Sequence, residues 1–198
     1  KKRKIIGNTF IEVFEKEAKG LNGIQFLKNC FGNPSSTHSY GRSAKSFIET
    51  SRKSIAKILN CEPGEIIFNS GGTESDNSIL KCAVKDLGVK HVISSKIEHH
   101  AITHTLEEIE NKDVKVHYVG LKDEGEVDIE DLERLLRSNN EPKLVSLMYI
   151  NNEIGNILDV KSVSELCRKY NAYFHSDAVQ AVGHYPIDLS SLNIDFLS

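Results

Sequence analysis

The sequence predicts an α/β protein in three layers, with a mainly parallel sheet covered by helices on both faces. Segments with the 3.6-residue apolar repeat of a helix alternate along the chain with short apolar segments typical of strands. Strands separated by whole helices need crossover connections, which favour parallel pairing. The length of 198 residues suits a single domain, and the 39% hydrophobic content together with 13 glycines lies in the globular range.

The first half of the chain contains three helix-like segments and two strand-like segments. Ala44, Phe47 and Ile55 share one face at helical spacing. A turn at Pro63-Gly64 then precedes an apolar stretch. We therefore expect, in order, a helix over about 42–60, a strand over 65–69, a helix that opens near Thr73, a strand over 91–95 and a helix over 101–110.

The second half continues the alternation and holds the strongest strand prediction, the apolar stretch from Lys143 to Ile150. Leu132 and Leu136 mark a helix face before it. We expect, in order, an extended segment over 114–119, a helix around 129–136, a strand over 143–150, a helix around 160–167 and a strand over 172–175. Residues 1–30 fit this rhythm least well, although the apolar residues from Phe10 to Ala18 are compatible with one helix.

Composition excludes several classes of protein. Lys and Arg number 25 against 28 Asp and Glu, so no basic excess exists to hold a polyphosphate backbone, and we expect no nucleic-acid partner. No apolar run approaches the roughly 20 residues of a membrane span, and the basic start from Lys1 to Lys4 lacks the apolar core of a signal peptide. The four cysteines are scattered without a CxxC pair, which suits a reducing compartment such as the cytoplasm.

The loop from Ser70 to Asn77 is the first candidate binding segment, because ligands of open parallel sheets bind beyond the carboxyl ends of the strands. Gly71 and Gly72 permit a tight turn, and the helix that follows offers N–H groups and a positive dipole end. Together with the Thr73 hydroxyl these groups form a candidate phosphate cradle. The alternative is a capping box made by Thr73 and Asp76. Neither GxGxxG nor GxxxxGK[ST] occurs, so no dinucleotide fold or P-loop is indicated.

A histidine cluster follows the next predicted strand. His99 is placed either to stack on a flat cofactor and shuttle protons, or to lie exposed in a loop. His100 and His104 are four residues apart and suit one helix face as metal ligands, but no carboxylate completes the set at matching spacing and HExxH is absent. We therefore predict no metal site.

Two later strand ends carry an asparagine pair and an aspartate. Asn151 and Asn152, followed by Gly155, are typical of a turn. Asp177 follows a buried strand, where a carboxylate is costly without a cationic partner. A protonated pyridinium nitrogen would be such a partner. The alternative is an aspartate that caps a following helix.

One hypothesis uses all four strand ends, namely a site for pyridoxal 5'-phosphate (PLP). Each signal is modest alone, but the four occur in an order that suits one ligand. The hypothesis assigns the phosphate to Thr73, the ring face to His99, the ring oxygen to Asn152 and the ring nitrogen to Asp177.

At these residues the chain resembles the cysteine desulfurases, which belong to the class V aminotransferase-like group of fold-type I PLP enzymes. The similarity keeps the family's order and spacing through the motifs Phe31-Gly32-Asn33-Pro34-Ser35-Ser36 with His38, Ser70 to Asn77, Glu98-His99, Asn151 to Gly155, His175 to Gln180 and Asp195 to Ser198. The resemblance implies a divergent N-terminal segment over 1–30 and part of a PLP-binding large domain over 31–198.

The resemblance also implies roles for six residues. They are Gly72, Thr73, His99, Asn152, Asp177 and Gln180. The first two would hold the cofactor phosphate, and His99 would stack on the ring and shuttle protons as the catalytic residue. Of the remaining three, Asp177 would keep the ring nitrogen protonated, whereas the asparagine and the glutamine would contact the ring's phenolic oxygen.

Two departures from the family follow from the same match. The family's N-terminal strand has no counterpart in residues 1–30. The Schiff-base lysine, the arginine that grips the substrate carboxylate and the nucleophilic cysteine fall after the position matched by Ser198, and Cys167 fits a helix core instead. We therefore expect this chain to correspond to the N-terminal half of an enzyme and to be inactive alone.

The leading functional hypothesis is a cysteine desulfurase, which removes sulfur from L-cysteine to give alanine and an enzyme persulfide for iron–sulfur cluster or thiolated-cofactor assembly. The resemblance implies a homodimer, a sulfur-acceptor or cluster-scaffold partner, and a location in the cytoplasm or, in a eukaryote, the mitochondrial matrix. The alternatives are a related PLP enzyme, such as a selenocysteine lyase or class V aminotransferase, and a non-catalytic fragment that acts as a binding scaffold.

Overall fold

A five-stranded parallel sheet forms the centre of the protein. The computed structural model describes residues 4–5 and 32–198. The strands run in the order β4-β3-β5-β6-β7, and every neighbouring pair is parallel. Their bounds are β3 His91–Ser94, β4 Lys115–Tyr118, β5 Lys143–Ser146, β6 Tyr173–Ser176 and β7 Phe196–Leu197. The parallel sheet that the sequence predicts is confirmed.

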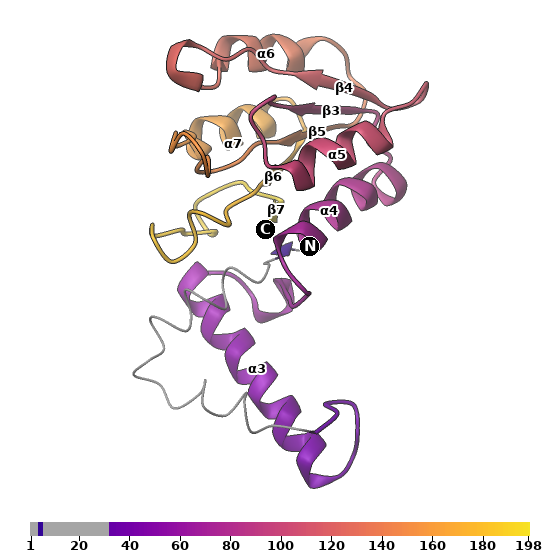
Figure 1. Cartoon of the computed structure of the whole chain (residues 1–198), viewed down its shortest axis with the longest axis vertical. Coiled ribbons are helices and arrows are strands. Elements are labelled where there is room, and N and C mark those ends of the chain that lie inside the picture. Colours follow the sequence, from indigo (N-terminus) through magenta and orange to yellow (C-terminus); the bar gives the residue numbers. More distant parts are fainter. Residues whose placement is uncertain (1–3, 6–31) are drawn as a thin grey trace.

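Helices cover both faces of this sheet, while the longest helix, α3, extends away from it (Figure 1). The helices are α3 Ser39–Leu59, α4 Gly72–Asp86, α5 His100–Ile109, α6 Ile129–Arg137 and α7 Val160–Lys169. Two short 3-10 helices, η2 Pro63–Glu65 and η3 Asp123–Gly125, lie in the connections. Each helix predicted from residue 42 onward is therefore present, with ends shifted by a few residues.

Consecutive strand residues bury their side chains on opposite faces of the sheet. Val92 and Leu144 pack with α4 and α5 in one apolar cluster. Ile93 and Val145 pack with α3, α6 and α7 in the other. All four side chains are buried. Since neighbouring residues of a strand point to opposite sides, this division is what a sheet covered on both faces requires, and it confirms the three-layer α/β fold.

Side-chain caps fix where several helices begin. The Asp128 carboxylate accepts hydrogen bonds from the first backbone N–H groups of α6, and Asp159 does the same for α7. At the carboxyl end of α3, Asn60 adopts a left-handed conformation with φ of 54°. Its backbone N–H donates to carbonyl groups in the last turn of the helix. These residues satisfy backbone groups that a helix terminus leaves unpaired.

The predicted strand over 65–69 is shorter than expected and joins a different sheet. Only Ile66–Ile67 form a strand, β2, which pairs in parallel with β1, Lys4–Ile5. β1 also contacts β7 without forming a ladder with it. β2 is thus one strand away from the five-stranded sheet, and the expectation that it shares a sheet with the other strands is wrong.

The strand predicted over 143–150 leaves the regular ladder after Ser146, yet its backbone continues beside β6. Leu147 donates its N–H to the His175 carbonyl, and Tyr149 donates to the Asp177 carbonyl. This pairing brings the segment that follows β5 next to the segment that follows β6. The helix considered between Phe10 and Ala18 lies outside the described residues.

Within residues 4–5 and 32–198, no helix is long and apolar enough to cross a membrane.

Replacing Leu106 of α5 tests the packing of the first apolar cluster. Leu106 is fully buried there. Leu106→Ala should lower the free energy of unfolding by about 2–5 kcal/mol, because it removes buried methyl groups and leaves a cavity. Leu87→Ala, at a side chain that is 38% exposed, is the control and should cost far less. Equal denaturation midpoints for the two variants would contradict this packing.

Candidate functional site

The predicted site residues line one cavity at the carboxyl ends of the strands. The cavity has a volume of about 210 Å³ and is lined by Gly72, Thr73, Asp76, His99, Met148, Asn152, Asp177, Val179 and Gln180. All six residues assigned from the sequence are among them. The structure therefore brings together four segments that are far apart in the chain, while their roles in binding a cofactor remain predictions.

The amino terminus of α4 forms one wall of the cavity. Gly71 is its N-cap and provides no side-chain hydrogen bond, so the predicted capping box between Thr73 and Asp76 is absent. Thr73 instead lies in the first turn of the helix, where backbone N–H groups and the positive dipole end favour an anion. A Cβ atom on Gly72 would lie 2.9 Å from Val179 Cγ2, so the close approach of α4 to the Asp177 loop requires glycine here.

His99 is both the N-cap of α5 and a residue of the cavity wall. Its Nδ1 accepts a hydrogen bond of 3.2 Å from the Ala101 backbone N–H. The ring itself is exposed and lines the cavity. This bond orients the ring and, because Nδ1 is the acceptor, places the proton of the neutral imidazole on Nε2.

Asn151 and Asn152 have different places in the structure, one in the turn and one at the cavity wall. Asn151 builds the turn, since its side-chain oxygen accepts from the N–H groups of Glu153 and Ile154. Gly155 completes that turn with φ of 77°, a left-handed value that favours glycine. Asn152 instead contributes to the cavity wall. The expected turn is therefore present, while the ligand contact expected of Asn152 stays a prediction.

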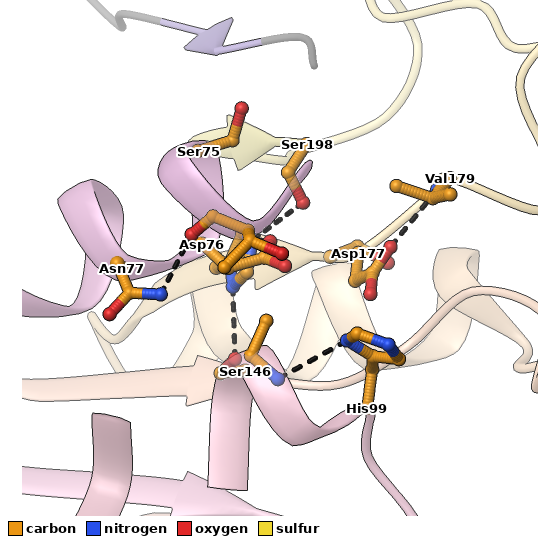
Figure 2. A network of polar contacts seen from close by, with 12 residues as sticks. Ser75, Asp76, Asn77, His99, Ser146, Asp177, Val179 and Ser198 are labelled. Atoms are coloured by element: carbon orange, nitrogen blue, oxygen red, sulfur yellow. Dashed lines mark hydrogen bonds and ion pairs between the residues drawn. The ribbon is translucent and has the colours of Figure 1, made fainter. Parts of the chain in front are cut away.

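Asp177 is buried at the end of β6 and faces the cavity. Its Oδ1 accepts a hydrogen bond of 3.0 Å from the Val179 N–H, and its carboxylate points toward the His99 ring (Figure 2). Burial, followed by the charge of Asp76, raises the pKa of Asp177 to about 6. A turn rather than a helix follows, so the alternative of a helix cap is wrong.

Asp76 and His175 belong to the same buried network, and the sequence motifs contained them without a role in ligand binding. Both side chains are buried, and His175 Nδ1 lies 2.9 Å from Ser146 Oγ. His175 Nε2 lies 3.2 Å from Ser198 Oγ and 3.5 Å from Asp76 Oδ1. The network connects α4 with β5, β6 and the residue that follows β7, beside Asp177 (Figure 2).

The histidine pair on α5 does not extend into a metal site. The rings of His100 and His104 stack with centroids 5.2 Å apart on an exposed helix face. No group of three or more potential metal-binding side chains occurs in the part of the chain that the structure describes.

A larger groove of about 730 Å³ lies at the opposite ends of β5 and β6, beside Glu141, Arg168 and Tyr173. It contains none of the residues assigned from the sequence. Its arginine is already hydrogen-bonded to Asn193. The smaller cavity is the better candidate because the buried polar groups converge on it.

Comparison with known proteins agrees with the family resemblance of the sequence motifs. Residues 21–198 match the family model described as aminotransferase class-V. The chain is 46% identical over 178 residues to a protein from Clostridium botulinum named cysteine desulfurase IscS, and 43% identical over 175 residues to one of that name from Dictyoglomus turgidum. Each match covers 88% or 87% of this chain but 44% of the relative. The chain thus spans about half the length of the curated relatives it matches.

Solved structures agree with the sequence comparison. A NifS-like protein from Rickettsia africae superposes with a TM-score of 0.78 at 36% identity, covering 94% of this chain and 49% of that one. A second NifS-like protein superposes with a TM-score of 0.81 at 34% identity, covering 97% and 53% of the two chains. With the fold, the cavity and these matches in agreement, the chain belongs to the class-V aminotransferase family.

Proposed function

We propose that the protein is a PLP-dependent cysteine desulfurase. In the proposed reaction the C–S bond of L-cysteine breaks and its sulfur joins an enzyme thiol, which becomes a persulfide. The bonding electrons of the broken bond remain with the carbon, which gains a proton, so the second product is alanine. The observation that carries this proposal is the convergence of Thr73, His99 and Asp177 on one cavity. The names of the similar proteins support it.

The donor set of the cavity fits PLP. Asp177 is buried, and among the described residues that line the cavity there is no lysine or arginine. A cationic ring nitrogen would supply the missing counter-charge. At the opposite wall, the first turn of α4 offers N–H groups to a phosphate. An anion site and a cation site thus face one cavity, as PLP requires.

Each proposed contact follows from a residue already in place. The first turn of α4 and the Thr73 hydroxyl would bind the phosphate, and the amide groups of Asn152 and Gln180 would donate to the phenolic oxygen. Asp177 would hold the proton on the ring nitrogen. When bound, the cofactor supplies an electron sink that stabilises negative charge on the substrate carbon.

His99 is the proposed proton carrier. Its Nδ1 accepts the Ala101 N–H, so the neutral ring carries its proton on Nε2, and Nε2 is the atom that would present a proton above the cofactor ring. Since the same bond fixes the ring at the start of α5, the imidazole is held in orientation before any ligand arrives.

Two of the cysteines are poor candidates for the sulfur-accepting thiol. Burial raises the pKa of the Cys167 thiol, and burial together with Asp86 raises the pKa of Cys82. A raised pKa disfavours the thiolate, which is the nucleophilic form. We therefore assign the persulfide to another cysteine of the protein.

The remaining properties are proposals of the same kind. We propose that the protein acts as a homodimer in the cytoplasm, or in the mitochondrial matrix of a eukaryote, and passes its sulfur to an acceptor or cluster-scaffold protein. Cys82 and Cys167 take part in no disulfide, which suits such a compartment.

Incubation of the full-length, PLP-treated protein with L-cysteine tests the activity. We expect alanine by chromatography and, by mass spectrometry, one added sulfur on a single cysteine. L-selenocysteine and pyruvate as alternative substrates distinguish a selenocysteine lyase and an aminotransferase. If alanine appears only in the presence of an amino donor and pyruvate, the desulfurase assignment is wrong.

Asp177→Asn should lower turnover at least about a hundredfold, because a neutral amide cannot hold the ring nitrogen protonated. Folding should be preserved, since the change keeps the side-chain shape and removes a buried charge. Asp113→Asn, at an exposed position before the amino end of β4, is the matched control and should retain turnover. Turnover and thermal unfolding are measured for both. Near wild-type turnover in Asp177→Asn would mean that Asp177 only stabilises the turn that follows β6.

The affinity for PLP should fall as the pH decreases below about 6. The pKa of Asp177 is about 6 in the ligand-free protein, so its carboxylate is lost below that value and with it the counter-charge for the ring nitrogen. We expect about a tenfold loss per pH unit relative to Asp177→Asn, which cannot titrate. Fluorescence titration from pH 7 to pH 5 measures this. If the PLP affinity of the two proteins changes with pH in the same way, the role of the Asp177 carboxylate is contradicted.

Gly72→Ala should weaken PLP binding roughly tenfold, because the new Cβ would meet Val179 Cγ2 at 2.9 Å and push apart the two walls of the cavity. Val179→Ala in the same protein should restore most of the affinity by removing the obstructing methyl group. Dissociation constants for the single and double variants decide the matter. If the double variant binds no better than Gly72→Ala, the clash is not the cause.

A further inference from the structure

Three buried carboxyl groups from three separate segments converge behind and around the cavity. Asp76 comes from α4, Glu98 from the turn that precedes α5, and Asp177 from the end of β6; they are 1%, 9% and 5% exposed. The basic groups that face them are the imidazoles of His99 and His175. The electrostatic influence of Asp177 and Asp76 extends to Glu98, so the three behave as one group of like charges.

Glu98 has little support for a negative charge. Ser95 Oγ donates a hydrogen bond of 2.6 Å to its Oε1. Its Oε2 is buried and has no hydrogen-bond partner in the described part of the chain. A buried carboxylate with one oxygen unpaired and no cation beside it is far more costly than the neutral acid.

The protonation equilibria agree with this geometry. Burial, with added repulsion from Asp177 and Asp76, raises the pKa of Glu98 to about 8. The hydrogen bond from Ser95 and the Met148 backbone oppose that rise but are outweighed. The pKa of Asp177 rises only to about 6, because the Val179 N–H, His175 and His99 favour its anion. At neutral pH the proton therefore resides on Glu98 rather than on Asp177.

Glu98 also connects to the residues that shape the cavity. Its bond to Ser95 closes the turn over residues 95–98, which leads directly into His99. The Ile97 carbonyl of that turn accepts a 2.7 Å hydrogen bond from Asn151 Nδ2, which belongs to the turn that presents Asn152. A charge on Glu98 would pull this turn toward water and disturb two walls of the cavity together.

We propose that Glu98 is a positioning residue that stays protonated in the working site, keeping the turn before His99 packed and leaving Asp177 as the carboxylate that meets the ring nitrogen. The inference rests on the proposed function for the identity of the ligand, PLP. Loss of the Glu98 proton then sets an upper pH limit for cofactor binding, separate from the lower limit set by Asp177.

Infrared difference spectroscopy of the full-length, ligand-free protein tests the proton itself. At pH 7 the wild type should show a protonated carboxyl band that disappears with a midpoint near pH 8. Glu98→Gln should lack this band, whereas Glu107→Gln, at an exposed carboxylate on α5, should keep it. Absence of the band from the wild type at pH 7 overturns the proposal, whether or not PLP binds.

Stability provides a second readout that needs no ligand. Because the folded pKa of Glu98 lies above the ordinary value of 4.5, the folded state gains stability from this proton below pH 4.5 and loses it progressively up to about pH 8. The denaturation midpoint of Glu98→Gln should therefore rise relative to wild type across that interval. A constant difference between the two would contradict a protonated Glu98.

The pH dependence of PLP affinity tests the positioning role. Above pH 8 wild-type affinity should fall about tenfold per pH unit relative to Glu98→Gln, which cannot ionise. Ser95→Ala removes a hydrogen bond that favours the charged form of Glu98, so the upper pH limit for PLP binding should move to higher pH. If Glu98→Gln does not fold, this shift tests the positioning role in its place. The same high-pH decline in all three proteins overturns the positioning role. Absence of PLP binding in every protein at every pH instead refutes the proposed function, while the infrared result still decides the state of Glu98.

Discussion

The parallel pairing of β3, β5 and β6 is the constraint on which the site depends. Parallel strands that share a register end at the same edge of the sheet, and the segments that follow them must start side by side. His99, Asn152 and Asp177 follow these three strands in turn, so the pairing alone places them around one space. The fourth wall comes from α4, which packs against α5 and against the sheet face that carries Val92 and Leu144.

The cavity combines a helix amino terminus with a buried group of carboxyls, an arrangement that lowers stability in the absence of a ligand. Asp177 has a raised pKa because burial and Asp76 oppose its charge. A protein core without function would replace such groups with apolar side chains of similar size. Buried carboxyls with perturbed pKa values beside a cavity are instead typical of a site that meets a charged ligand.

Local structural roles and ligand-facing roles coincide in several residues. His99 caps α5 through Nδ1 while its ring lines the cavity. Asp177 accepts the Val179 N–H and still faces the same space. For such residues a capping or turn interpretation and a functional interpretation are compatible, because a cap holds a side chain in the fixed orientation that binding needs. The structure excludes the capping box at Thr73 and the helix cap at Asp177.

The sequence by itself determined the α/β class, the order of helices and strands, and the four segments that follow the strand ends. These features depend on local periodicity and on motifs that lie within a few residues of one another. The tertiary structure alone decided that β2 pairs with β1 and that β5 is four residues long, since strand pairing depends on distant segments. It also decided the surroundings of Glu98, which come from Ser95, Asp76 and Asp177 together and raise its pKa. Burial and the distance between charges control a pKa, and neither quantity exists until the chain has folded.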